Sequence, residues 1–415
     1  MGTGTFVNQS LQRSMSRRFR SVRTGIDFVL VGVVITLVLF GLLMVYSAGP
    51  LFAALLKQNA DYFLIRQSMW AVLGFLGAGV LMFVDYHFYK RFTLLIMGGT
   101  VALLLAVIVI GDITFGATRS LNEGSIRPSE VAKLATILYV AVWLNAKKEV
   151  LNDITFGLLP LIFILGIVGA LIMLQPDFSA AFTIIILGAV LFFLAGGEWR
   201  QIALVVVITL ILGWVIINLY PTGKDRVMGF WSGLQEPVKA DYQVRRSLEA
   251  IIRGGVFGVG IGNSVTKLTG LPVAHNDSIF AVIAEETGLV GAFLLITAYL
   301  VLLWRGLTIA RHAPDELGRL IAGGITIWIV LEAMLNIGVS VNLLPQAGNA
   351  LPFISYGGSS LVSTLAGVGI LLNIGRLGNQ QKQKGEQNFG AVVNLRWRDG
   401  RRRVSRPVHP ASPEE

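Results

Sequence analysis

The segment "GLPVAHNDSIFAVIAEETGLVGAFLLITAYLVLLW", residues 270–304, joins a polar turn to a long apolar run. The turn carries His275, Asn276 and Asp277, and the apolar run keeps two adjacent carboxylates, Glu285 and Glu286. A run of about twenty apolar residues is long enough to cross a bilayer as a helix. Because ionisable side chains are costly in hydrocarbon, this segment predicts a membrane helix whose acids meet a partner or a functional interior.

The rest of the chain has the same character. Of its 415 residues, 54% are hydrophobic and only 14% are charged. Apolar runs recur from end to end without a polar stripe, as expected of helices in a lipid-embedded bundle. The composition therefore predicts an all-α integral membrane protein, with strands improbable. The chain has no cysteine, which excludes disulfides, thiol catalysis and thiolate metal sites.

Hydropathy predicts about ten transmembrane helices. An even count puts both termini on one side, and the bias of Lys and Arg among the short loops makes that side cytoplasmic. We therefore expect a basic cytoplasmic N-terminal tail (1–26), a membrane domain (27–376) and a basic, disordered cytoplasmic tail (377–415). The predicted spans are 27–47, 68–84, 93–110, 130–145, 156–174, 178–195, 201–220, 279–304, 319–343 and 359–375.

The net charge of +10 gathers in the two tails. Basic residues next to a membrane helix act as topology signals and contact anionic lipids, so this charge favours membrane lipids as partners over nucleic acid.

One connection, residues 221–278, is much longer than the others and is predicted to lie on the outer face. Its segment "YQVRRSLEAIIRGGVFGVGIGNSVTKL" reads as an amphipathic helix followed by a Gly-rich turn. Loops of this length usually carry function, although a simple extramembrane cap on the bundle is the alternative.

Polar residues within the spans are few, and each has a structural and a functional interpretation. Glu130 and Lys133 lie three apart on one helix face, where they neutralise each other or where Lys133 meets an anionic ligand. Gln175 and Asp177 stand between two apolar runs, so Asp177 either caps the next helix or faces a cavity. Asp277 either caps its helix or is a base at the outer membrane edge, and the deeper acids are structural or functional.

The stretch "NLLPQAGNALPFISYGGSSLVSTLAG" has the character of a re-entrant loop. Two prolines and the pair Gly357 and Gly358 break helicity before Ser359 and Ser360 begin a helix. Irregular backbone at membrane depth is tolerated where it lines a protein-enclosed or water-filled cavity.

Seven motifs, in order, resemble the SEDS family, which comprises FtsW, RodA and SpoVE. The resemblance covers about residues 27–376, and "GIGNSVTKL" is more similar to FtsW or SpoVE than to RodA. The motifs are "MVYSAG", "RPSEVAKLA", "QPDFSAAF", "YQVRRS", "GVGIGNSVTKL", "PVAHNDSIFAVIAEETGLVG" and "LPFISYGGSSL".

The resemblance implies a ten-helix bundle that polymerises peptidoglycan glycan strands from lipid II on the outer face of the cytoplasmic membrane. It implies a class B penicillin-binding protein transpeptidase as partner, with other division proteins, at the division septum. By resemblance Asp277 is the essential carboxylate, Glu130 and Lys133 form a buried ion pair, and Arg119 matches an Arg of the family pattern. The remaining candidate substrate-binding residues are Gln175, Asp177, Arg226, Gln243, His275, Asn276, Ser355, Gly357, Gly358 and Ser359.

The chain departs from the family pattern at several positions. Val273 replaces the usual Glu, so a second acid four residues before Asp277 is missing. Asn276, Ser278 and Ser120 also differ from the residues usual in the family. These changes weaken a mechanism with two carboxylates and leave the need for a metal open.

The expected reaction is an inverting glycosyl transfer. Asp277 would take a hydroxyl proton, and Arg119, Lys133 or Arg226, with or without a divalent cation (Mg²⁺ or Mn²⁺), would stabilise the leaving pyrophosphate. A lipid II transporter, a non-catalytic scaffold for the transpeptidase, and polymerase roles in elongation or sporulation are the alternatives.

Overall fold

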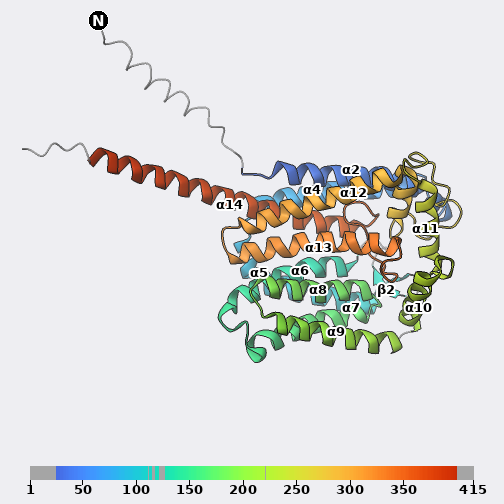
Figure 1. Ribbon diagram of the computed structural model, residues 1–415, viewed down its shortest axis with the longest axis horizontal. Coiled ribbons are helices and arrows are strands. Elements are labelled where there is room, and N and C mark those ends of the chain that lie inside the picture. Colours follow the sequence, from blue (N-terminus) through green and yellow to red (C-terminus); the bar gives the residue numbers. More distant parts are fainter. Residues whose placement is uncertain (1–24, 111, 115–116, 121–126, 220, 400–415) are drawn as a thin grey trace, which may run out of the picture.

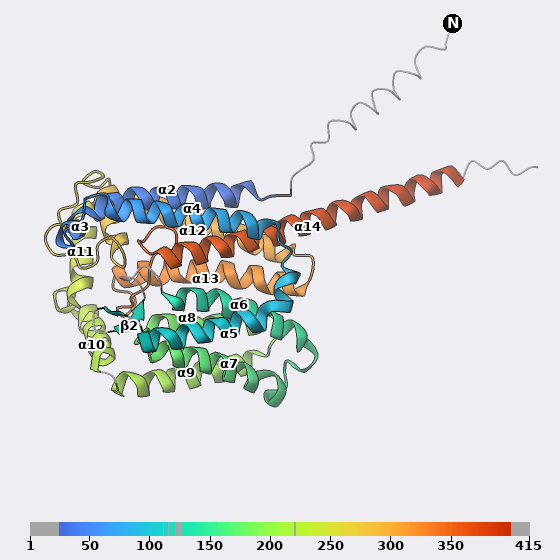
Figure 2. The same cartoon turned by 180° about the vertical axis from the view of Figure 1, so that it is seen from behind.

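Helices account for nearly all of the computed structural model, which describes residues 25–110, 112–114, 117–120, 127–219 and 221–399. Most of the long helices run side by side, and α10 and α11 lie across one end of the bundle (Figures 1 and 2). The elements are α2 (Phe28–Ala48), α3 (Pro50–Leu55), α4 (Tyr62–Phe83), α5 (His87–Ile110), β1 (Asp112–Thr114), β2 (Ala117–Ser120), α6 (Pro128–Ala146), η1 (Lys148–Val150), η2 (Ile154–Leu158), α7 (Leu159–Met173), α8 (Phe178–Leu194), α9 (Trp199–Leu219), α10 (Pro221–Gln235), η3 (Pro237–Lys239), α11 (Tyr242–Gly254), α12 (Ile279–Arg311), α13 (Glu316–Ser340) and α14 (Gly358–Asp399).

The predicted membrane spans all coincide with helices. Seven described helices are long and apolar enough to cross a bilayer by length and composition: α2, α4, α5, the stretch Ile154–Met173, α12, α13 and the first part of α14. The other three predicted spans fall on α6, which carries Glu130 and Lys133, and on the apolar helices α8 and α9. The helical membrane fold is confirmed, and the count of ten spans stays a prediction.

The two ends of the bundle differ in what they carry. Asn379 on α14 donates from its side-chain Nδ2 to the Gly25 carbonyl oxygen at 2.9 Å, so the beginning of α2 and the middle of α14 share one end. At that end Asp27 caps α2 and receives two hydrogen bonds from the Nε of Arg305, at 3.0 and 3.2 Å. The helices α10 and α11 lie at the opposite end (Figure 1).

The structure departs from the sequence prediction in three elements. β1 and β2 form a short antiparallel hairpin, with Ile113 opposite Thr118, which the expectation of an all-helical chain omitted. α14 continues to Asp399, although a disordered tail was predicted from residue 377. This segment is rich in Gln, Lys and Glu, which are good helix formers even where no core is available. Residues 1–24 and 400–415, assigned to the tails, lie outside the described residues.

The third departure is a break within α12, at Gly288, where φ is 69° and ψ is −168°. A Cβ on Gly288 would lie 2.3 Å from the Gly258 nitrogen, so only glycine fits against the incoming loop. The freed amides are satisfied, because Leu289 N donates to Gly255 O at 2.9 Å and Val290 N to Val256 O at 3.1 Å. The long loop therefore pairs with α12 about two turns below the beginning of that helix.

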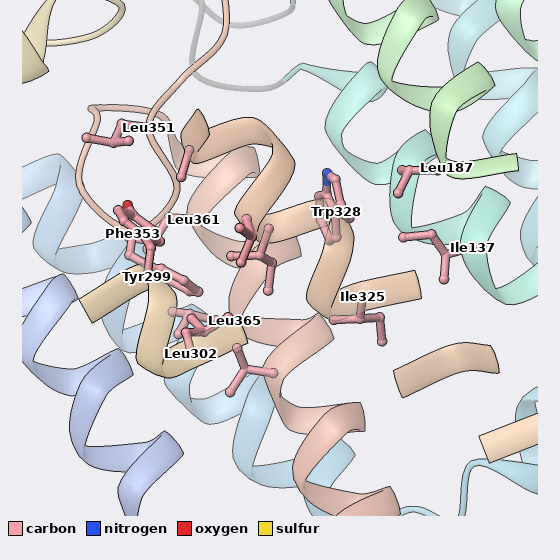
Figure 3. Close-up of a cluster of buried hydrophobic side chains, with 14 of the residues drawn as sticks. Ile137, Leu187, Tyr299, Leu302, Ile325, Trp328, Leu351, Phe353, Leu361 and Leu365 are labelled. Carbon is pink, nitrogen blue, oxygen red and sulfur yellow. The ribbon is translucent and has the colours of Figure 1, made fainter. Parts of the chain in front are cut away.

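The core surrounds α13. Trp328 lies between Ile137 of α6 and Leu187 of α8 on one side and the group around Tyr299 and Phe353 on the other (Figure 3). Tyr299 Oη donates to the Pro352 carbonyl oxygen at 2.6 Å, which ties α12 to the loop before α14. In a bilayer such contacts stabilise by close packing and internal hydrogen bonds, because lipid tails are as apolar as the core.

Candidate functional site

Two irregular segments meet at the end of the bundle that carries α10 and α11. Segment 270–278 precedes α12, and segment 343–357 precedes α14. Tyr356 N donates to the His275 carbonyl oxygen at 2.9 Å, and Ser355 Oγ donates to the Asn276 carbonyl oxygen at 2.7 Å. Ser355 Oγ also accepts from Leu351 N at 2.8 Å. These bonds satisfy backbone groups that no helix or sheet pairs, so the two segments support each other.

Asp277 lies in the first of these segments and is partly buried. The N-cap of α12 is Ser278, not Asp277, and the Ser278 side chain makes no capping hydrogen bond. The interpretation of Asp277 as a cap is therefore wrong. Its backbone carbonyl oxygen accepts from Asn336 Nδ2 of α13 at 2.9 Å. Asp277 thus lies at the end of the bundle that carries α10 and α11, and its backbone carbonyl is held by α13.

His275 and Asn276 are both buried beside Asp277. The imidazole of His275 lies among three aromatic rings, with centroid distances of 4.7 Å to Phe52, 4.6 Å to Phe63 and 5.7 Å to Tyr356. Burial, with the nearby positive charge of Arg127, lowers the pKa of His275 to about 4. The ring is therefore neutral at pH 7 and does not serve as a cation for a phosphate.

Gln243 begins a chain of side-chain hydrogen bonds that fastens α11 over this region. Its Nε2 donates to Ser278 Oγ at 3.0 Å, and its Oε1 accepts from Gln346 Nε2 at 2.6 Å. Ser278 Oγ in turn donates to the Pro272 carbonyl oxygen at 2.9 Å. The predicted amphipathic helix is thus confirmed as α11, and Gln243 joins both irregular segments.

The glycine and serine residues that begin α14 serve packing and backbone bonding. Gly357 N donates to Gln67 Oε1 at 3.2 Å, and Ser359 Oγ accepts from Arg127 N at 2.8 Å. A Cβ on Gly358 would lie 2.5 Å from the Trp70 ring. These residues bring the beginnings of α6 and α14 together.

Lys133 lies between two carboxylates. Its Nζ donates to Glu130 Oε1 at 2.8 Å, as the sequence predicted, and also to Glu332 Oε1 of α13, which the sequence analysis missed. The side chains of Lys133, Glu130 and Glu332 are only 3%, 8% and 2% exposed. Because two acids already share this ammonium, Lys133 is not a free cation for a pyrophosphate.

Asp177 and Gln175 have structural partners. Asp177 Oδ1 accepts from Ala180 N at 3.2 Å and Ser179 Oγ at 3.0 Å, so it caps α8, while Oδ2 accepts from Ser129 Oγ of α6 at 3.0 Å. Gln175 Nε2 donates to the Leu104 carbonyl oxygen of α5 at 2.9 Å. The capping interpretation of Asp177 is confirmed, and both residues join neighbouring helices.

Three arginines stand near the site. Arg119 lies in β2, and its side chain is outside the described residues. Arg226 lies on α10 and is partly exposed. Arg127 precedes α6, is also partly exposed, and its charge acts on His275. Arg127 was not among the predicted site residues, although it stands directly before "PSE" at the beginning of a helix.

Glu285 and Glu286 hold the long loop. Glu285 accepts from Val265 N at 3.1 Å and Thr266 N at 3.3 Å, and also from Ser264 Oγ. Glu286 Oε1 accepts from Lys267 Nζ at 2.6 Å.

Ser47 of α2 joins the same contact, since its Oγ donates to Glu286 Oε1 at 2.6 Å. Lys267 Nζ also reaches the Gly262 carbonyl oxygen at 2.9 Å. The two carboxylates in the apolar run are therefore structural anchors, and they satisfy loop amides and one buried ammonium.

A divalent cation stays a prediction. Among the residues that the structure describes, no three His, Asp or Glu side chains gather in a way that could hold a metal ion. Mg²⁺ commonly uses one or two carboxylates together with substrate phosphates, so any such ion would depend on the pyrophosphate for most of its ligands.

Comparison with protein families matches residues 28–380 to the cell cycle protein family of FtsW, RodA and SpoVE. The chain is 38% identical over 354 residues to the probable peptidoglycan glycosyltransferase FtsW of Geobacter sp. strain M18, covering 84% of this chain and 96% of that protein. It is 35% identical over 359 residues to the stage V sporulation protein E of Bacillus subtilis strain 168, covering 85% and 98%.

Two solved structures are similar to the whole membrane bundle. One is a chain of a peptidoglycan synthase complex that coordinates polymerization and crosslinking, with a TM-score of 0.70, 28% identity, and coverage of 86% of this chain and 99% of that chain. The other is the rod shape determining protein RodA of Thermus thermophilus, with a TM-score of 0.63, 26% identity, and coverage of 86% and 98%.

Proposed function

This chain belongs to the FtsW, RodA and SpoVE family of cell cycle proteins, and we propose that it is a peptidoglycan glycosyltransferase that polymerises glycan strands from lipid II. The observation that carries the proposal is Asp277, a carboxylate at the outer edge of the bundle whose backbone is fixed and which does not cap its helix. A relative that is 38% identical is a probable peptidoglycan glycosyltransferase FtsW, and on this similarity we place the activity in cell division.

In the proposed reaction, the 4-hydroxyl of one lipid-linked disaccharide attacks the anomeric carbon of the other glycan chain. The carboxylate of Asp277 accepts the hydroxyl proton as the new glycosidic C–O bond forms. The bond between the anomeric carbon and the pyrophosphate oxygen breaks, undecaprenyl pyrophosphate leaves, and the anomeric configuration inverts.

The leaving pyrophosphate requires a positive counter-charge. Lys133 is buried and shared by two glutamates, so its role becomes structural: it joins α6 to α13. Arg127, Arg226 and Arg119 remain the candidates for this charge. Arg127 is favoured because it stands at the beginning of α6, where the helix dipole and the guanidinium both attract an anion.

Two other functions explain part of the structure. A lipid II transporter would use broken helices and intramembrane polar residues, yet the acids of α12 bind the long loop through hydrogen bonds. A scaffold that only recruits a transpeptidase would leave Asp277 without a chemical role. RodA-like elongation and SpoVE-like sporulation are alternative settings for the same polymerase chemistry. The 35% identity to the sporulation protein supports the second of these.

We place the protein in the cytoplasmic membrane at the division septum, with α10 and α11 outside and both tails inside. Similarity to a chain of a synthase complex supports a class B penicillin-binding protein as partner. Alkaline phosphatase fused at residue 415 should be inactive, and the same enzyme fused at residue 236 should be active. The reverse result would overturn the proposed orientation.

Polymerisation itself tests the function. The purified chain, alone and with its transpeptidase, is incubated with labelled lipid II, and the products are separated by length. We expect glycan polymer that depends on Asp277. Absence of polymer from both samples, with folded protein and intact substrate, would contradict the proposal and favour a scaffold, and movement of lipid II across vesicles without polymer would favour a transporter.

A further inference from the structure

Asn336 of α13 holds the Asp277 segment through its side-chain amide. The side chain is 3% exposed, in a helix otherwise dominated by apolar residues. Its Nδ2 donates to the Asp277 carbonyl oxygen at 2.9 Å and to the Asn349 carbonyl oxygen at 2.7 Å. One amide group thus joins the segment before α12 to the segment before α14.

The chemistry of the amide makes this contact specific. A carboxamide nitrogen carries two hydrogens in one plane, and here the two acceptors are carbonyl oxygens of two different segments. The orientation of the amide is fixed, because its oxygen could not replace the nitrogen opposite two acceptors. Alanine has no donor, and aspartate presents only acceptors at neutral pH.

The position of Asn336 on α13 adds a second constraint. Glu332 lies four residues earlier and therefore on the same face of the helix, where it contacts Lys133 of α6. The same face of α13 thus contacts Lys133 of α6 through Glu332 and the Asp277 carbonyl oxygen through Asn336. Ser340, one turn further, donates from its Oγ only to the Asn336 backbone carbonyl oxygen, at 2.9 Å.

We propose that Asn336 is a positioning residue for Asp277: its amide sets where the carboxylate stands relative to the attacking hydroxyl. The proposal rests on the proposed function, in which Asp277 is the base. A general base must lie within hydrogen-bond reach of the proton that it accepts, and a displacement of about 1 Å can lower the rate about 10²-fold. Asn336 itself does not touch the reacting atoms.

The test compares Asn336→Ala and Asn336→Asp with Ser340→Ala as the matched control. All three change a buried hydrogen bond on α13, but the control leaves both bonds of the Asn336 amide in place. In polymerisation of lipid II we expect kcat to fall about 10²-fold in the two Asn336 variants, with KM changed less than about threefold. Asn336→Gln keeps the two donors and should recover part of the loss.

Hydrogen–deuterium exchange gives a readout that does not depend on activity. In folded Asn336→Ala, amides of residues 270–278 and 346–357 should exchange faster, whereas those of residues 292–305 in α12 should not change. Unchanged exchange in both irregular segments would overturn the proposal.

A double variant shows whether Asn336 acts through Asp277. Because a lost positioning residue matters only if the base is present, Asn336→Ala should lower the rate of Asp277→Asn no further. An additive loss would overturn the proposal. A normal rate in Asp277→Asn alone would instead show that the proposed base is wrong, and the exchange experiment would still decide whether Asn336 holds the segment.

Discussion

Asp177 and Asp277 have similar sequence settings, and the structure gives them different surroundings. Each follows a proline-containing polar stretch and precedes an apolar helix at the same end of the bundle. Both oxygens of Asp177 accept hydrogen bonds from the beginnings of α6 and α8. At α12 the N-cap is Ser278, and the backbone carbonyl oxygen of Asp277 accepts a hydrogen bond from Asn336.

The contrast shows that hydrogen-bond partners distinguish a structural carboxylate from one proposed to act in catalysis. A carboxylate that accepts backbone and hydroxyl hydrogen bonds at a helix N-terminus contributes to stability and has little capacity left to accept a proton. Asp277 is positioned instead by the hydrogen bond that its main-chain carbonyl oxygen accepts from Asn336. Glu285 belongs with Asp177 in this respect, because its Oε1 accepts from two loop amides and its Oε2 accepts from Ser264 Oγ.

The largest effect is expected from Asp277→Asn. The amide keeps the size of the side chain but cannot accept the proton, so the polymerisation rate should fall roughly 10²- to 10⁴-fold. The protein should remain folded and still bind its transpeptidase. The measurement is the initial rate of glycan polymer formation from labelled lipid II, beside a thermal unfolding curve.

Glu286→Gln is the matched control for this change, since it also neutralises a carboxylate of the segment 270–304. It weakens the contact with Lys267 and should lower stability more than it lowers the rate per folded molecule. If Glu286→Gln abolished synthesis in stable protein while Asp277→Asn polymerised normally, Glu286 and not Asp277 would be the carboxylate that takes part in the reaction.

The second effect concerns the buried ammonium of Lys133. Lys133→Met leaves Glu130 and Glu332 without a cation and should destabilise the protein by about 3–5 kcal/mol. Glu130→Gln should be milder, because Glu332 still pairs with Lys133. The double variant Lys133→Met with Glu130→Gln still buries the charge of Glu332. Only the further change Glu332→Gln should restore most of the stability.

Thermal unfolding in detergent, with a fixed lipid content, measures this series. Equal unfolding temperatures for the parent and Lys133→Met would show that the ammonium is peripheral and that the three side chains do not join α6 to α13.

The sequence was most informative where a contact is local or where hydropathy dominates. The apolar runs located the seven described helices that are long and apolar enough to cross a bilayer. The spacing of Glu130 and Lys133 gave their pairing, and the position of Asp177 before α8 gave its cap. These contacts join residues at most four apart, so the helix repeat alone brings them together. The amphipathic pattern of residues 242–254 located α11 for the same reason.

Contacts between distant segments could not be read in this way. Glu332 is 199 residues from Lys133, Asn336 is 59 residues from Asp277, and Ser47 is 239 residues from Glu286. No periodicity relates such positions. A weaker signal was present, because Glu332 and Asn336 are polar residues one turn apart in an apolar helix, which predicts that this face meets the protein interior.

The third prediction uses the pH dependence of stability at His275. Its pKa lies at about 4 in the folded protein, below the value of roughly 6.5 for an exposed histidine. Between these values the unfolded chain binds a proton that the folded protein does not, so stability falls as pH decreases from about 6.5 to 4, by about 3 kcal/mol in all.

His275→Phe should remove this dependence, because a phenyl ring fits among Phe52, Phe63 and Tyr356 and does not titrate. Unfolding temperatures of parent and variant from pH 4 to 7 test the prediction. Curves of parent and variant that stay parallel through this range would show that the imidazole is not held in its neutral form.

The smallest effect is expected from Asp177, and it completes the comparison with Asp277. Asp177→Ala removes the cap of α8 and the acceptor for Ser129, which should lower stability by about 1 kcal/mol. Asp177→Asn keeps a side-chain oxygen that can accept from Ala180 N, so its stability should differ little from that of the parent. Both variants should polymerise lipid II at close to the parental rate per folded molecule, since neither change reaches the Asp277 segment. A large loss of rate in stable Asp177→Asn would mean that this carboxylate also takes part in the reaction. A capping role would then no longer distinguish Asp177 from the proposed catalytic residue Asp277.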